Sequence, residues 1–132
     1  MTVTFVDTNV VMYAVGREHP LQGEARSFFQ RAVTEGDALV TSAEVLQELL
    51  HAYLPVGRTA TLDKALDLLR KAIGEVWDLE ADDAYLARSL AERHPHLGAR
   101  DLVHLASCRR RKVSSVKTFD RSLAAAFEQA GG

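Results

Sequence analysis

Cysteine and long apolar runs are scarce in this sequence of 132 residues. The single cysteine, Cys108, excludes an intramolecular disulfide framework and is typical of a reducing compartment. No apolar run approaches the roughly 20 residues that a transmembrane helix needs, and no basic-then-apolar leader opens the chain. We therefore expect a cytoplasmic protein that makes no use of a membrane.

An excess of one charge is also lacking, because 16 basic and 18 acidic side chains leave a formal net charge of −2. A global positive field for holding nucleic acid is therefore excluded, whereas local basic patches around an acidic site are not. Apolar residues make up 47% of the sequence, which is enough for a substantial core. A chain of this length is expected to form one domain, spanning residues 1–132.

Short strand-like patterns alternate with longer helix-like patterns along the chain. Strands are expected at residues 3–6, 38–41, 75–79 and 113–117. Helices are expected at residues 9–15, 21–35, 42–54, 59–74, 81–93, 100–111 and 119–130, with glycines at 131–132 ending the last one. Such alternation predicts an α/β fold, with a short parallel sheet of about four or five strands flanked by about seven helices.

The stretch around which the chain is organised lies near its start, where an apolar strand ends on an acid. Val3, Phe5 and Val6 suit a strand that is buried on both faces. Asp7 would then sit at the carboxyl end of a central strand, where open α/β sheets bind their ligands. Taken alone, Asp7 is more simply a helix cap that accepts from the amides of residues 9–10.

Two glutamates lie on one face of the helix expected at residues 42–54. Glu44 fits a capping box beginning at Thr41, in which the glutamate reaches back to the amide of the cap residue. Glu48 has no such duty and is the better candidate for a site. On spacing alone, a solvated helix face explains Glu48 equally well.

Two further acids occupy the starts of helices. Asp101 opens the sixth helix and Asp120 follows the fourth strand, where the helix dipole favours an acid without any function. Asp7, Asp101 and Asp120 each lie where a strand or a loop leads into a helix, and Glu48 lies about two turns into a helix that leaves the end of a strand. Four carboxylates that converge at one edge of the sheet would repel one another unless a cation balanced them. Oxygen ligands suit Mg²⁺ or Mn²⁺ rather than zinc, and the chemistry to expect is hydrolysis of a phosphodiester by an activated water.

Four motifs carry these acids, in order along nearly the whole chain. They are Phe-Val-Asp-Thr-Asn at 5–9, Ser-Ala-Glu-Val-Leu-Gln-Glu-Leu at 42–49, Arg-Asp-Leu-Val-His-Leu-Ala at 100–106 and Thr-Phe-Asp at 118–120. In this combination the chain resembles the PIN domain and, within it, the VapC-type ribonuclease toxins of bacterial toxin–antitoxin pairs. Each motif alone is weak, but four in register are specific.

The resemblance implies a single PIN-like domain that acts as a metal-dependent endoribonuclease toxin. It implies a catalytic and metal-binding set for one or two Mg²⁺ or Mn²⁺ ions, made of Asp7, Glu48, Asp101 and Asp120. Asn9 and Thr118 would orient these carboxylates or bind the metal's water. The resemblance also implies an RNA substrate, a homodimer, and a cognate antitoxin whose tail blocks the site.

Basic residues offer candidate RNA contacts. Arg100, Lys117 and Arg121 flank the acids directly, and we expect them to contact phosphates. The run at 109–112 is explained equally well by cations at a helix carboxyl terminus and by contacts to an RNA backbone.

Other functions remain as alternatives. A phosphatase that works through an aspartyl-phosphate would need a second acid where Asn9 stands. A receiver domain would need an acidic pair after the first strand, which residues 5–7 do not supply, and an aspartate at the end of the third strand. A zinc site of His94, His96 and His104 lacks a supporting cysteine pair. A PIN-like nuclease of RNA processing, outside toxin–antitoxin systems, and a catalytically silent PIN module for protein binding are the closer alternatives.

Overall fold

The computed structural model describes residues 2–129 and contains one parallel sheet with the strand order β3-β2-β1-β4. The strands are β1 (Val3–Val6), β2 (Ala38–Ser42), β3 (Glu75–Trp77) and β4 (Ser115–Lys117). β1 lies inside the sheet and pairs in parallel with β2 on one side and β4 on the other. The sequence predicts about four or five strands, and the sheet has four within the described residues.

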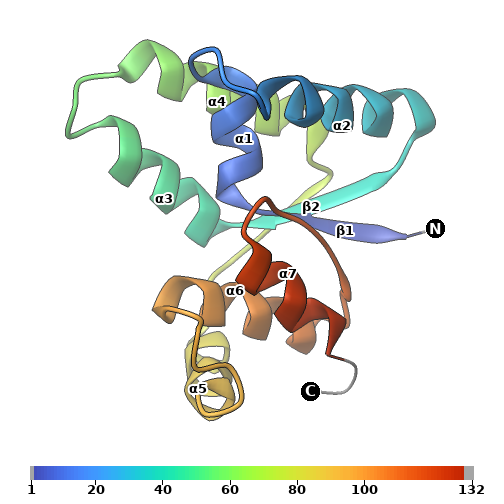
Figure 1. The fold of residues 1–132 in the computed structure, drawn as a ribbon, viewed down its shortest axis with the longest axis vertical. Coiled ribbons are helices and arrows are strands. Elements are labelled where there is room, and N and C mark those ends of the chain that lie inside the picture. The colour runs from blue at the N-terminus through green and yellow to red at the C-terminus, as the bar shows by residue number, and fades with distance from the viewer. Residues whose placement is uncertain (1, 130–132) are drawn as a thin grey trace.

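Seven helices connect these strands over residues 2–129. They are α1 (Thr8–Val15), α2 (Gln22–Glu35), α3 (Ala43–Tyr53), α4 (Thr59–Ala72), α5 (Ala81–Leu90), α6 (Ala99–Arg110) and α7 (Arg121–Glu128). Figure 1 shows α1 to α4 on one side of the sheet and α5, α6 and α7 on the other. The predicted α/β fold with helices on both faces is therefore confirmed.

The connections from β1 determine where a site can form. The chain proceeds from β1 to β2 and β3 in one direction, whereas β4 returns to the opposite side of β1. Val6 lies in register with Lys117, so the residues after β1 and after β4 emerge side by side. This reversal of strand order is the place where open α/β sheets bind ligands.

The centre of the sheet is held by an aromatic pair in the core. The rings of Phe5 and Trp77 stack with their centroids 5.8 Å apart, and Phe5 is fully buried. Val6 is fully buried too, but Val3 is 37% exposed. The prediction of a strand buried on both faces is therefore wrong at Val3, the first residue of β1.

The chain forms two apolar clusters on opposite sides of the sheet. The larger cluster joins β1, β2 and β3 to α1, α2, α3 and α4, and it includes Cys108 of α6. The smaller cluster joins α5, α6 and α7. Helix α6 therefore contributes to both clusters and joins the two layers.

The last helix is shorter than the sequence pattern predicts. It begins at Arg121 rather than at residue 119, because Asp120 caps it with its side chain. The predicted end of this helix at residues 130–132 lies outside the described residues. None of the helices within residues 2–129 is both long and apolar enough to cross a membrane.

Candidate acidic active site

Asp7 lies at the carboxyl end of β1 and is almost completely buried, with 5% of its surface exposed. Its Oδ1 accepts from the Thr8 amide at 2.8 Å, and its Oδ2 accepts from the Thr118 hydroxyl at 2.7 Å. The expected cap therefore forms, but through Thr8 and not through the amides of residues 9–10. Burial raises the pKa of Asp7 above its ordinary value, and the nearby His104 opposes that rise.

Glu48 of α3 faces Asp7 across the end of the sheet. Its Oε2 accepts from the Thr8 hydroxyl at 2.8 Å, and its Oε1 lies 2.6 Å from Nε2 of His104. The sequence leaves open whether Glu48 is a site residue or part of a solvated helix face. These contacts favour the first, because the side chain is held in a cluster of polar groups. The capping box predicted from Thr41 and Glu44 is wrong.

Helix α3 instead starts after Ser42, which makes no side-chain cap. The Thr41 hydroxyl donates to the carbonyl of Val6 at 2.9 Å and so ties β2 to the end of β1. Thr41 is therefore a residue of strand β2 and not the cap of α3. The capping pattern gives no indication of its contact with Val6.

His104 of α6 is the principal site residue that the sequence analysis missed. It is 1% exposed, and its Nε2 lies 3.8 Å from Oδ1 of Asp7 as well as beside Glu48. Burial alone would lower the pKa of His104, but the contact with Glu48 and the charge of Asp7 raise it overall. Burial would likewise raise the pKa of Glu48, but His104 and Thr8 lower it overall. Both directions indicate an imidazolium paired with a carboxylate.

A signal for His104 was present in the sequence, because it follows Asp101 by one helical turn on the same face. Thr8 was missed as well, although it directly follows the first acid. One ligand atom from each of Asp7, Glu48 and His104 lies within 4.8 Å of the others. Because a protonated His104 has no free lone pair, the two carboxylates are the members of this group that suit a metal ion.

Asp101 lies in the first turn of α6, and neither Asp101 nor Asp120 belongs to the metal-sized group found within residues 2–129. Its pKa is raised to about 6, first by burial and then by the negative charges of Asp7 and Asp120. No hydrogen bond to its carboxylate is found among residues 2–129, so both oxygens remain available to a ligand. The raised pKa thus reflects burial first and neighbouring negative charge second.

Asp120 and Asp7 are joined through Thr118. The Thr118 hydroxyl donates to Asp7 and accepts from the Asp120 amide at 3.0 Å and from the Asn9 side chain at 3.2 Å. Asn9 also accepts from the amide of Phe119 at 3.2 Å. Asn9 and Thr118 therefore link the segments that follow β1 and β4. Asp120 in turn caps α7 by accepting from the Ser122 and Leu123 amides.

The three basic residues expected to contact RNA have different surroundings. Arg100 is exposed and lines a small cavity of about 60 Å³ beside Glu48. Arg121 is exposed next to Asp120. Lys117 is bonded to Glu24 at 2.8 Å and lies over the ring of Phe119. Lys117 is thus already paired, whereas Arg100 and Arg121 remain accessible.

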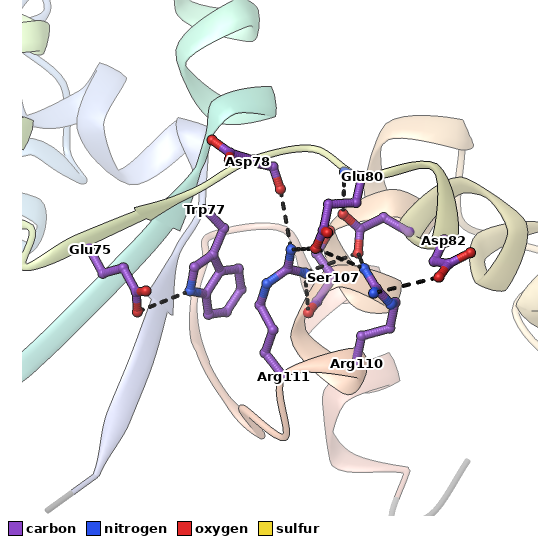
Figure 2. Close-up of polar contacts among 9 residues, drawn as sticks. Glu75, Trp77, Asp78, Glu80, Asp82, Ser107, Arg110 and Arg111 are labelled. Carbon is purple, nitrogen blue, oxygen red and sulfur yellow. Dashed lines mark hydrogen bonds and ion pairs between the residues drawn. The ribbon is translucent and has the colours of Figure 1, made fainter.

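The basic run at 109–112 is mainly structural. Arg110 and Arg111 both donate to Asp83 of α5, at 2.7 and 2.9 Å, and Asp83 is completely buried. Figure 2 shows that Arg111 also lies against Trp77 and reaches Glu80. These contacts favour a structural role for Arg110 and Arg111, because both side chains join α5 to α6.

The three histidines considered for zinc lie in different surroundings. His94 is buried in the loop between α5 and α6, and the only metal-sized group of ligands found within residues 2–129 contains neither His94 nor His96. His104 belongs to the acidic cluster instead, where its neighbours are carboxylates.

A family model for the PIN domain matches residues 4–128 of the chain. Ribonuclease VapC23 of Mycobacterium tuberculosis is 61% identical over 123 residues, which cover 93% of this chain and 97% of that protein. Ribonuclease VapC13 of the same organism is 36% identical over 116 residues, covering 88% of each chain.

Solved structures share the same fold. The crystal structure of Mycobacterium tuberculosis VapC20, described as a Sarcin-Ricin loop cleaving toxin, superposes with a TM-score of 0.74 at 23% identity, covering 93% of this chain and 94% of that one. VapBC2 from Rickettsia felis, bound to a DNA fragment from its promoter, gives a TM-score of 0.72 at 17% identity, with coverages of 94% and 92%. At these identities the likeness concerns the fold alone.

Proposed function

This chain belongs to the PIN-domain family and, within it, to the VapC-type ribonucleases, and we propose that it hydrolyses RNA at its acidic cluster. The proposed catalytic set is Asp7, Glu48, Asp101 and Asp120. The observation that carries the proposal is the close grouping of Asp7, Glu48 and His104, in which one ligand atom of each lies within 4.8 Å of the others. Asp101 and Asp120 are proposed to act at the same site, because the charges of Asp7, Asp120 and Glu48 all contribute to the raised pKa of Asp101.

The donor set fits a divalent cation with a preference for oxygen ligands, and we propose Mg²⁺ or Mn²⁺. Each oxygen of Asp7 and Glu48 is engaged in a contact with the protein, but a carboxylate oxygen has a second lone pair for a metal. Asp101 accepts no hydrogen bond within the described residues and is the most available ligand. When bound, such an ion supplies Lewis acidity, which activates water and neutralises charge on the phosphate.

The neighbouring residues hold the acids in place. Thr118 binds one oxygen of Asp7, while Thr8 and His104 bind the two oxygens of Glu48. These contacts restrict the rotation of both carboxylates before any ligand arrives, which lowers the cost of binding. His104 also supplies a positive charge that offsets part of the repulsion among the acids.

We further propose the partners that the family implies. The RNA strand would follow the exposed Arg100 and Arg121 on either side of the acids. A homodimer, a cognate antitoxin that blocks the site, and a cytoplasmic location complete the proposal. The presence of all four acids favours an active nuclease over a silent PIN module for protein binding.

The direct test is cleavage of a panel of structured RNAs with Mg²⁺ or Mn²⁺. We expect Asp7→Asn to reduce cleavage by at least about 100-fold, because even residues that only orient metal ligands contribute about 10- to 100-fold. Asp63→Asn is the matched control, since Asp63 is exposed on α4. Equal cleavage by the parent and Asp7→Asn would exclude Asp7 from the site.

A further inference from the structure

A second pocket, of about 270 Å³, lies between α7 and the loop that follows α5. It is adjacent to the acidic cluster, because Ser122 lines the pocket and donates its amide to Asp120 at 2.9 Å. The pocket and the cluster thus share the first turn of α7. Its volume is close to the lower limit of about 300 Å³ for small-ligand sites, so it suits one nucleotide unit rather than a duplex.

The pocket combines an apolar floor with a basic rim. Pro95, Leu97 and Ala126 contribute apolar surface. Arg93 and Arg121 are exposed, and neither forms a salt bridge with a carboxylate in the part of the chain that the structure describes. The apolar surface suits the face of a base, and the two free guanidinium groups suit a phosphate.

His94 provides a separate indication of a ligand. It lines the pocket and is 5% exposed, and its Nε2 is buried without a hydrogen-bond partner among residues 2–129. Leaving such a group unpaired costs about 1 to 3 kcal/mol. Burial and the positive charges of Arg109 and Arg93 lower the pKa of His94, so this region carries positive potential. A ligand with a negatively charged or hydrogen-bonding oxygen would satisfy it.

We propose that this pocket is a second subsite for the RNA strand, which receives a nucleotide flanking the cleaved bond. Its base lies on the apolar floor, its phosphate contacts Arg93 and Arg121, and a polar atom of the nucleotide pairs with His94. Single-stranded RNA presents splayed bases to proteins in this way. The inference rests on the proposed ribonuclease function and extends it to the substrate's path.

Binding can be separated from cleavage in the Asp7→Asn background, using a fluorescently labelled RNA stem-loop without divalent ions. We expect Arg93→Gln with Arg121→Gln to weaken binding about tenfold, because this variant removes both guanidinium groups of the basic rim. The slope of log affinity against log salt should also fall by about 0.7 for each phosphate that the variant no longer neutralises. The matched control is Arg31→Gln with Lys64→Gln, which removes two exposed basic residues on the other side of the sheet. Unfolding temperatures verify that each variant is folded.

A second variant fills the pocket without changing its charge. Ala125 lines the pocket and is exposed on α7, so Ala125→Phe should weaken RNA binding several-fold and leave the salt slope unchanged. Binding that matches the controls in both the charge variant and the filling variant would overturn the inference. Binding of a poly-glutamate peptide is measured in parallel as a model of an acidic protein segment. Variants that lose poly-glutamate binding and keep their RNA affinity would assign the pocket to such a segment and would also overturn the inference.

The same measurements distinguish failure of the subsite from failure of the proposed function. If the wild-type protein cleaves RNA and the pocket variants bind RNA normally, the subsite is excluded and the ribonuclease proposal stands. If the wild-type protein neither cleaves nor binds any RNA of the panel, both the ribonuclease proposal and the subsite are excluded.

Discussion

At the residue scale, Asp101 is the acid whose ionisation depends most clearly on its neighbours. Its pKa is raised to about 6 by burial and by the charges of Asp7, Asp120 and Glu48. In an unfolded chain the pKa of an aspartate is about 3.9. Between these two values the native state holds more protons than the unfolded state, so the stability of the metal-free protein falls as the pH rises.

Asp101→Asn should therefore stabilise the metal-free protein above pH 6. The full pKa shift is discounted because the carboxylate is partly exposed, which leaves about 1 kcal/mol, or about 3 °C in unfolding temperature for a domain of this size. Below about pH 4 the two proteins should unfold alike, since Asp101 is then protonated in both states. Calorimetric scans with a chelator at both pH values measure this. If Asp101→Asn changed the unfolding temperature equally at both pH values, the raised pKa of Asp101 would be contradicted.

At the element scale, α6 is held at both ends. Its first turns carry Asp101 and His104 toward the acidic cluster, while Arg110 and its neighbour Arg111 pair with the buried Asp83 of α5. Arg111 also lies over Trp77, with 4.8 Å from its guanidinium carbon to the ring centroid. The basic end of α6 therefore stabilises the layer on which two site residues depend.

Asp83→Asn should destabilise the fold by about 2 kcal/mol, because it removes the buried counter-charge of two partly buried arginines and leaves them only exposed acids such as Glu80. Chemical denaturation at neutral pH gives this free energy of unfolding. Arg88→Gln is the control on the same helix, since it removes an exposed ion pair with Glu92 and should leave stability unchanged. Equal stability of Asp83→Asn and the parent would show that the ion-pair cluster does not hold the layers together.

At the scale of the whole molecule, the site lies where the two helical layers meet the end of the sheet. Asp7 and Glu48 come from the segments after β1 and β2, whereas Asp101 comes from the opposite layer. A cation held between them would connect the layers and relieve the repulsion among the acids. Ion binding and global stability should therefore be coupled.

Mg²⁺ or Mn²⁺ should raise the unfolding temperature of the wild-type chain, and a chelator should reverse the effect. At an ion concentration of 100 times the dissociation constant, the expected gain is about 2.7 kcal/mol. The gain should be larger above pH 6 than below it, because Asp101 must ionise to bind. Asp7→Asn should reduce the gain strongly, and an equal gain in both proteins would place the ion elsewhere.

Several features of this protein were determined by local sequence alone. The alternation of strands and helices, the positions of Asp7, Glu48, Asp101 and Asp120, and the specific four-motif pattern were all readable, because periodicity and turn residues act over short distances. The matching PIN-domain model confirms the family resemblance. The four carboxylate roles stay predictions, supported by their convergence.

Other features were decided only by the tertiary structure. His104 reaches Glu48 across 56 residues of sequence, and Thr118 reaches Asp7 across 111. Arg110 and Arg111 meet an acid from another helix. Such pairs depend on how packed layers bring distant segments together. A local pattern specifies which face a residue occupies, but not which partner packing places opposite it.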